Sequence, residues 1–243
     1  MPSLSILSLT LGALCLSLHA APPNIVFILV DDLGWSDLGC YGADLHETPH
    51  IDRLASQGMR FTQAYAASPV CTPTRASLMT GRHPARLHMT IWHEGAKAAP
   101  NRRRPWLEAK AQPNLPLENV TCAEVLRKGG YHTWHVGKWH LGDAQHYPQA
   151  HGFDLNIGGT FWGAPNTFWY PYSGTERYRN FRYVPNLPFG REGEYLTDRL
   201  TTEAVRLLDR AGDRPFFLNL WYYTVHTPIE GKEELVERYR KKL

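Results

Sequence analysis

The sequence has little net charge, few cysteines and no long hydrophobic run, and each shortage excludes a class of protein. The formal net charge of the 243 residues is only +3, which excludes a generally polybasic nucleic-acid-binding protein. No apolar run reaches the ~20 residues that a helix needs to span a bilayer, so no stable membrane anchor is predicted. The remaining composition, 43% hydrophobic and 20% charged residues, is typical of a globular domain.

The longest apolar run lies at the amino terminus, from Leu4 to Leu18, and is followed by Ala20-Ala21. Small residues after such a run are typical of a signal-peptidase site. We therefore predict a signal peptide over residues 1–21 and export to a periplasmic, secreted or lysosomal-type compartment. No Lys or Arg precedes the run, and a buried N-terminal helix is the alternative.

Cysteines are few and histidines are many. Of the four cysteines, Cys15 falls in the predicted signal peptide, which leaves Cys40, Cys71 and Cys122. An odd number argues against a framework of disulfide bonds and leaves one cysteine for another use. The 12 histidines cluster along the chain, which favours a metal-binding or acid–base site.

Apolar runs alternate with amphipathic segments along the rest of the chain. Three strands are predicted, over residues 24–30, 131–136 and 215–220. Helices are predicted between them, over residues 48–58, 121–129 and 195–209. The first strand is a continuous apolar run, as in a strand buried on both faces of a parallel sheet. This alternation predicts an α/β fold.

Two stretches without periodicity, residues 88–117 and 158–193, are predicted to be long surface loops. Long loops in a compact domain often bind ligands. The first loop contains the run Arg102–Arg104. This run is compatible with contacts to an anionic ligand and equally with a solvated cluster of charges.

Cys71 begins the most specific pattern in the chain. It is the first residue of a Cys-x-Pro-x-Arg pattern that ends at Arg75 and is followed by an apolar segment and a Thr-Gly-Arg triplet. Alone, the pattern is also compatible with a buried thiol in a proline turn.

Two further patterns place polar residues after predicted strands. Asp31 and Asp32 follow the first strand, whereas Lys138 and His140 follow the second. In open α/β sheets, ligands bind at the carboxyl ends of the strands. Without the other patterns, the two aspartates would be interpreted as turn-forming or capping residues.

Together, the three patterns resemble the formylglycine-dependent (type I) sulfatase family in order and rough spacing, from about Pro23 to His226. The resemblance implies an alkaline-phosphatase-like sandwich, in which helices flank a central, mostly parallel sheet. It also implies hydrolysis of sulfate esters. The aromatic loops favour a sulfated carbohydrate as the substrate, since aromatic faces stack on sugar rings.

The resemblance implies a modified residue and a metal ion. A formylglycine-generating enzyme would oxidise Cys71 to formylglycine, whose hydrate has two hydroxyl groups: one attacks sulfur, and the other then expels sulfate. Asp31, Asp32 and the oxidised Cys71 would bind Ca²⁺. Mg²⁺ is possible too, because hard oxygen ligands suit both ions.

The remaining roles are also implied by the resemblance. Arg75 would hold the diol and the metal-site carboxylates, and Lys138 would bind the sulfate. His140 would take a proton from the diol, and His226 would help to protonate the leaving oxygen. A histidine suits both steps because its unperturbed pKa lies near 6.5.

Four more histidines lie close to these patterns. We interpret His132 and His135 as core residues, with a supporting role at the site as the alternative. His88 and His93 are candidates for the lining of a substrate pocket.

One family feature is missing. Sulfatase catalytic domains contain a later Asp-Asn pair and a second lysine, and no Asp-Asn pair follows His226. The sequence therefore resembles the N-terminal portion of a catalytic domain, over residues 22–243, apparently truncated. Two alternatives stay open: a phosphate or phosphonate ester hydrolase of the alkaline phosphatase superfamily, against which Cys71 argues, and an inactive fragment that binds sulfated glycans.

Overall fold

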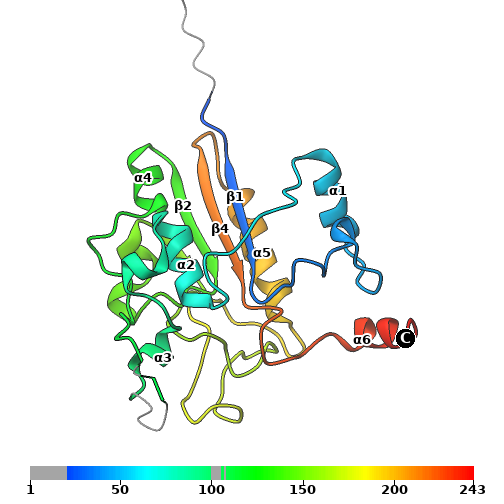
Figure 1. The fold of residues 1–243 in the computed structure, drawn as a ribbon. Coiled ribbons are helices and arrows are strands. Elements are labelled where there is room, and N and C mark those ends of the chain that lie inside the picture. The colour runs from blue at the N-terminus through cyan, green and yellow to red at the C-terminus, as the bar shows by residue number, and fades with distance from the viewer. Residues whose placement is uncertain (1–20, 100–104, 107) are drawn as a thin grey trace, which may run out of the picture.

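A parallel four-stranded sheet runs through the middle of the computed structural model, which describes residues 21–99, 105–106 and 108–243 (Figure 1). The strand order is β1-β4-β2-β3, and all three pairings are parallel. The strands are β1 (Ile25–Val30), β2 (His132–Gly137), β3 (Leu155–Ile157) and β4 (Phe216–Tyr222). The predicted α/β class is confirmed. Residues 1–20 of the predicted signal peptide and the run Arg102–Arg104 lie outside the described residues.

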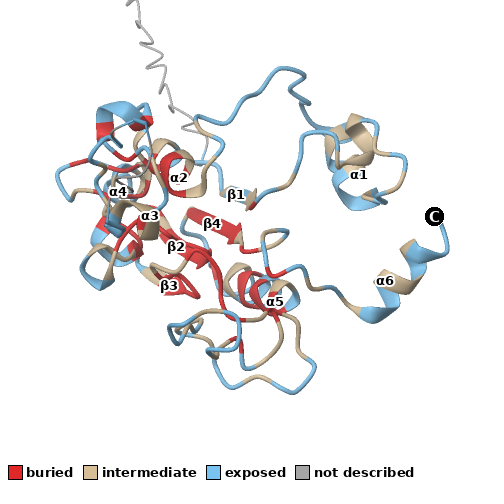
Figure 2. Ribbon diagram, turned by 60° about the horizontal axis from the view of Figure 1, so that its bottom comes forward, coloured by how far each residue is buried: buried red, intermediate tan, exposed pale blue. Residues whose placement is uncertain are grey.

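Helices cover both faces of this sheet. They are α1 (Pro49–Gln57), α2 (Cys71–Thr80), α3 (His93–Lys97), α4 (Cys122–Lys128), α5 (Leu196–Leu208) and α6 (Glu233–Arg240). Short 3-10 helices span Gly39–Tyr41, Pro84–Leu87, Ala144–His146 and Pro148–His151. Helix α5 packs on one face and α2 and α4 lie on the other, whereas α1 and α6 stand to the side of β1 and bury no residue completely (Figure 2).

The core consists of two layers because side chains of β4 alternate between the faces of the sheet. Leu218 and Leu220 pack into the layer that includes Leu200 of α5. Phe217 and Trp221 pack into the layer on the side of α2. A central strand that is buried on both faces is typical of a parallel sheet covered by helices.

A capping signal in the sequence sets the start of α4. Thr121 precedes α4, and its hydroxyl accepts a hydrogen bond from the Glu124 amide at 3.2 Å. The Glu124 carboxylate accepts one from the Thr121 amide at 2.7 Å, which completes a capping box. The helices predicted over residues 48–58 and 195–209 are likewise confirmed as α1 and α5.

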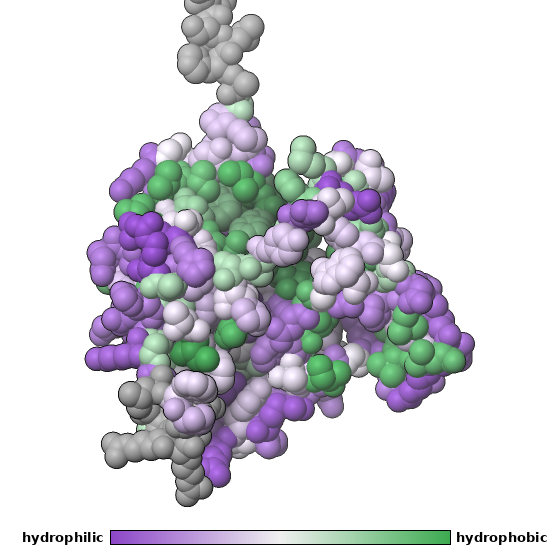
Figure 3. Space-filling view, in the orientation of Figure 1, coloured by the Kyte–Doolittle hydropathy of each residue, from purple (hydrophilic) through white to green (hydrophobic). Residues whose placement is uncertain are grey.

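The prediction that the first strand is buried on both faces is wrong. Val26 and Ile28 are 47% and 51% exposed. They pair with Leu218 and Leu220, so they share the face that α5 covers over the neighbouring strands. In the described chain β1 is an edge strand beyond the reach of that helix, and hydrophobic surface is visible near it between α4 and α1 (Figure 3).

The two predicted loops differ in content. Residues 88–117 contain the short helix α3. Residues 158–193 contain an isolated bridge between Gly174 and Arg182, and Trp169 forms a second bridge with Tyr195, just beyond this stretch.

Cys40, Cys71 and Cys122 are all free thiols, in agreement with the absence of a disulfide framework. No helix in the described ranges is long and apolar enough to cross a membrane.

Gly137, the last residue of β2, permits a close approach of β4 that a side chain would prevent. Its φ is +103°, and a Cβ atom there would lie 1.9 Å from the carbonyl oxygen of Trp221. We expect Gly137→Ala to lower the free energy of unfolding by at least about 3 kcal/mol, since strain and a backbone clash add. The control is Gly212→Ala, with φ +62° and open space around the Cβ, which should cost only about 1–2 kcal/mol. Urea unfolding curves measure both, and equal losses would contradict the clash argument.

Candidate active site

The residues that follow the strands meet at one edge of the sheet. Asp31 follows β1, Lys138 follows β2 and His226 lies beyond β4. Main-chain hydrogen bonds continue past the strand ends: the Asp31 amide donates to Thr224 at 3.0 Å, and the Lys138 amide donates to the Trp221 carbonyl at 2.7 Å. These residues are therefore held by extensions of the sheet.

Asp31 lies between two buried cations. Its Oδ1 accepts a hydrogen bond from Nη2 of Arg75 at 3.0 Å, and its Oδ2 pairs with the ammonium of Lys138. The three side chains are 7%, 1% and 0% exposed. Burial raises the pKa of Asp31, but the charges and hydrogen bonds of Arg75 and Lys138 outweigh burial and hold this pKa well below its usual range. The carboxylate is therefore ionised and compensates both cations.

Arg75 adds two further contacts to this cluster. Its Nη1 donates to the main-chain carbonyl of Lys138 at 2.8 Å. Its guanidinium lies 4.9 Å from the ring centre of Trp221, a cation–π arrangement. Arg75 therefore connects α2 to the ends of β1, β2 and β4.

Cys71 is the first residue of α2, and Val70 takes the N-cap position. It lines a pocket of about 360 Å³ together with Asp32, His140 and His226. The amino terminus of a helix favours negative charge. The structure thus brings four predicted site residues around one cavity, whereas Arg75 and Lys138 are buried beside it and contact Asp31.

His140 is held by its main chain. Its carbonyl accepts a hydrogen bond from the Thr72 hydroxyl at 2.8 Å, and its amide donates to the Thr160 carbonyl at 2.9 Å. Its φ is +59°, in the left-handed region that few residues other than glycine adopt. Burial lowers the pKa of His140 to about 4, although its hydrogen bond with Glu94 acts in the opposite direction. The imidazole is therefore neutral near pH 7.

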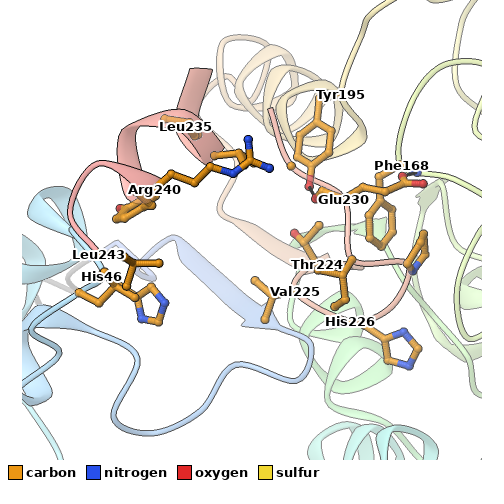
Figure 4. Close-up of a pocket in the computed structure, with 16 residues that line it drawn as sticks. His46, Phe168, Tyr195, Thr224, Val225, His226, Glu230, Leu235, Arg240 and Leu243 are labelled. Carbon is orange, nitrogen blue, oxygen red and sulfur yellow. Dashed lines mark hydrogen bonds between the residues drawn. The ribbon is translucent and has the colours of Figure 1, made fainter. Parts of the chain in front are cut away.

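His226 stands between two pockets. Its Nε2 lies 3.8 Å from Oδ2 of Asp32, and its side chain is 25% exposed. The second pocket, about 560 Å³, is mainly apolar and has walls from α6, from Phe168 and from Tyr195 (Figure 4). Of the predicted site residues, only His226 lines it.

Sequence reasoning missed two charged residues of the 360 Å³ pocket, Glu94 and Arg182. Arg182 donates to the Ala164 carbonyl at 3.0 Å, and its guanidinium carbon lies 3.3 Å from the ring centre of Tyr178. Both charged residues come from the stretches that were predicted to be long binding loops. That composition signal marked the segments, but it did not identify the residues.

The other histidines are structural or lie elsewhere. His135 is fully buried, as expected of a core residue, and its Nδ1 contacts the Asn219 amide at 2.9 Å. His132 is only partly buried and stacks on Trp134. His88 and His93, the candidates for the lining of a substrate pocket, do not line the pocket of Cys71. His88 is exposed, and His93 is buried, with Nδ1 2.7 Å from the Pro113 carbonyl.

Asp31 and Asp32 allow a test of what each carboxylate contributes to stability. We expect Asp31→Asn to lower the free energy of unfolding by about 3–5 kcal/mol in metal-free buffer, because two buried cations lose their partner. Asp32→Asn should change it by less than about 1 kcal/mol, since the Asp32 side chain is 59% exposed. Urea unfolding monitored by tryptophan fluorescence gives both values. Similar losses in the two variants would contradict the assignment of Asp31 as the structural carboxylate.

Comparison with known proteins relates this geometry to a family. A family model described as Sulfatase matches residues 23–242. The chain is 37% identical over 221 residues to N-acetylgalactosamine-6-sulfatase of Homo sapiens, an alignment that covers 86% of this chain and 40% of that protein. It is 45% identical over 148 residues to human steryl-sulfatase, with 58% and 24% covered.

A solved structure with a similar fold is that of a protein in complex with k-i-k-neocarrahexaose, at a TM-score of 0.71 and 33% identity. The match covers 90% of this chain and 49% of that chain, so this sequence spans about half the length, or less, of the proteins it matches. The predicted alkaline-phosphatase-like architecture is confirmed. Since the family model extends over nearly all of the described residues, this chain belongs to the sulfatase family.

Proposed function

We propose that the protein hydrolyses sulfate esters with a formylglycine made from Cys71 as its nucleophile. The observation that supports this most is the position of Cys71 at the start of α2, in a pocket that it shares with Asp32, His140 and His226. The proposal extends to residues 22–243 as the N-terminal portion of a catalytic domain and to residues 1–21 as a signal peptide for export.

The charges around Cys71 suit an anionic substrate. A sulfate ester repels nucleophiles, so a site must place positive charge or hydrogen-bond donors where the negative charge develops. In our proposal Arg75 orients the side chain at position 71 from one turn further along α2, and Lys138 supplies positive charge to the sulfate. Hydrated formylglycine supplies the attacking oxygen and a second hydroxyl that allows sulfate to be released.

Two histidines are available for proton transfer. The neutral, buried His140 suits the role of a base, because a neutral imidazole can accept a proton. His226 reaches the same pocket from the end of β4 and is partly exposed. We propose that it helps to protonate the leaving alcohol.

The oxygen donors of the proposed site suit Ca²⁺, but they would fill only part of its coordination shell. Asp31 and Asp32 are consecutive carboxylates at the end of β1, and an oxygen on the oxidised Cys71 would be a third donor, whereas Ca²⁺ takes 6–8 oxygens. Within the described ranges, no group of three or more His, Cys, Asp or Glu side chains is arranged to hold a metal ion. We propose Asp31, Asp32 and Cys71 as this chain's ligands for Ca²⁺ or Mg²⁺; the cation would add positive charge beside the sulfate.

We propose a sulfated carbohydrate as the substrate. Relatives include a sulfatase named for N-acetylgalactosamine 6-sulfate and a protein solved with an oligosaccharide. The aromatic rings of Trp92 and Tyr178 line the pocket, where they suit a sugar face. The similarity to steryl-sulfatase makes an apolar alcohol the second candidate, since an apolar pocket adjoins His226.

The first test of this proposal is the chemical state of Cys71. We expect the full chain, produced together with a formylglycine-generating enzyme, to lose this thiol and gain an aldehyde. Mass spectrometry of the tryptic peptide over residues 61–75 should show the lower mass and reaction with a hydrazine. Cys122 is the control, because it lies in α4 and should remain alkylatable after unfolding. An intact, alkylatable thiol at Cys71 under these conditions would refute the modification.

The second test is turnover. We expect the aldehyde-bearing chain to hydrolyse an aryl sulfate faster than the corresponding aryl phosphate, and Cys71→Ser to lose up to roughly 10⁶-fold in kcat, as when a covalent nucleophile is removed. Faster hydrolysis of the phosphate would favour a phosphate or phosphonate ester hydrolase. Binding of sulfated glycans without turnover would favour an inactive sulfoglycan-binding fragment.

A further inference from the structure

Glu94 contacts His140 from a part of the chain to which the family patterns assign no role. It lies in α3, and one carboxylate oxygen is 2.6 Å from Nε2 of His140. The other accepts a hydrogen bond from the Gly163 amide at 3.1 Å, and Nη2 of Arg182 lies 4.0 Å away. Both oxygens of Glu94 therefore face donors.

The protonation of this pair follows from its surroundings. Burial raises the pKa of Glu94, but the hydrogen bond with His140 and the other contacts outweigh burial and bring this pKa to about 2. An ionised carboxylate only accepts hydrogen bonds, so Nε2 of the neutral His140 must carry the ring proton. Nδ1 then carries the lone pair, and it is buried without a hydrogen-bond partner among the described residues.

We propose that Glu94 is a positioning residue that holds His140 in the tautomer protonated at Nε2, so that Nδ1 is the nitrogen available to accept a proton in the site. The role of that proton acceptor rests on the proposed function, in which the donor is a hydroxyl at position 71. The tautomer itself is a property of this chain's own side chains and does not require the modification or a metal.

Main-chain hydrogen bonds hold His140 in place but do not determine its ring tautomer, so a further group is needed to select it. Hydrogen bonds to Thr72 and Thr160 fix the backbone of His140, but they leave the choice of ring tautomer open. A carboxylate at Nε2 selects one tautomer and stabilises the imidazolium that forms when Nδ1 accepts a proton. Packing of Gly163 against the ring, where an added Cβ would lie 2.7 Å from Cε1, limits other orientations.

Glu94→Gln is a specific probe because a glutamine has only one acceptor oxygen. The Gly163 amide is a donor that cannot change, so we expect the amide oxygen of the glutamine to face it. The NH₂ group then points at Nε2 of His140 and can donate only to a lone pair there. The substitution should therefore move the ring proton to Nδ1 and remove the acceptor, while the side chain keeps its shape.

The decisive experiment is a two-bond ¹H–¹⁵N correlation spectrum of the full chain with ¹⁵N-labelled histidine near pH 7. The His140 signals are assigned by their loss in His140→Gln. We expect the wild type to be protonated at Nε2, Glu94→Asp to keep that tautomer, and Glu94→Gln to be protonated at Nδ1. The matched control is Glu203→Gln, which alters a buried ion pair with Arg199 in α5 and should leave the His140 spectrum unchanged.

A wild-type His140 protonated at Nδ1, or a Glu94→Gln variant that keeps the proton at Nε2, would overturn the proposal whether or not the protein is an active sulfatase. If Glu94→Gln does not fold, the wild-type and Glu94→Asp spectra still decide the tautomer.

Kinetics of the aldehyde-bearing chain provide the second arm. We expect Glu94→Gln to lower kcat by about 10²- to 10⁴-fold, the range of general acid–base catalysis, with KM changed only a few-fold and Glu94→Asp partly active. Unchanged kcat in Glu94→Gln would overturn the proposal. Absence of turnover in the wild type would instead count against the proposed function, and the spectrum would still test Glu94.

Discussion

The ion pairs of Asp31 determine how the candidate site is assembled. One buried carboxylate joins the end of β1 to Arg75 of α2 and to Lys138 after β2, although these residues are 44 and 107 positions away from it in the sequence. Removing such charges from water costs several kcal/mol per ion. The cluster is therefore stable only when all three partners are present, which makes the position of Cys71 on α2 depend on Asp31.

Burial also controls the charge of His140, which lies at the same edge of the sheet. Burial keeps its ring neutral, whereas the adjacent Glu94 remains ionised. Lys138, two residues earlier, adds a positive charge that also disfavours the imidazolium. The site thus places a neutral imidazole, which can accept a proton, beside an ionised carboxylate, which can stabilise the resulting charge.

Local patterns predicted the parts of this structure that depend on local physics. The capping box of Thr121 and the strand ends at Asp31 and Lys138 follow from short sequence signals. The burial of β1 was mispredicted, because an apolar run does not reveal whether a helix covers both faces of the strand it forms. Glu94 was missed since its contact with His140 joins residues 46 positions apart and no periodicity marks its loop.

Asp32 adds an energetic argument for a ligand at this edge of the sheet. Its φ is +61°, in the left-handed region that residues with a Cβ adopt less readily than glycine. In the described chain its one ion pair is with His226 at 3.8 Å, and its side chain is 59% exposed, so these contacts return little stability. Asp31 differs, because its pairing with Arg75 and Lys138 accounts for its carboxylate. A residue in this conformation that contributes little to the fold and lines the pocket of Cys71 agrees with the ligand role proposed for Asp32 above, whereas Asp31 already has two cationic partners.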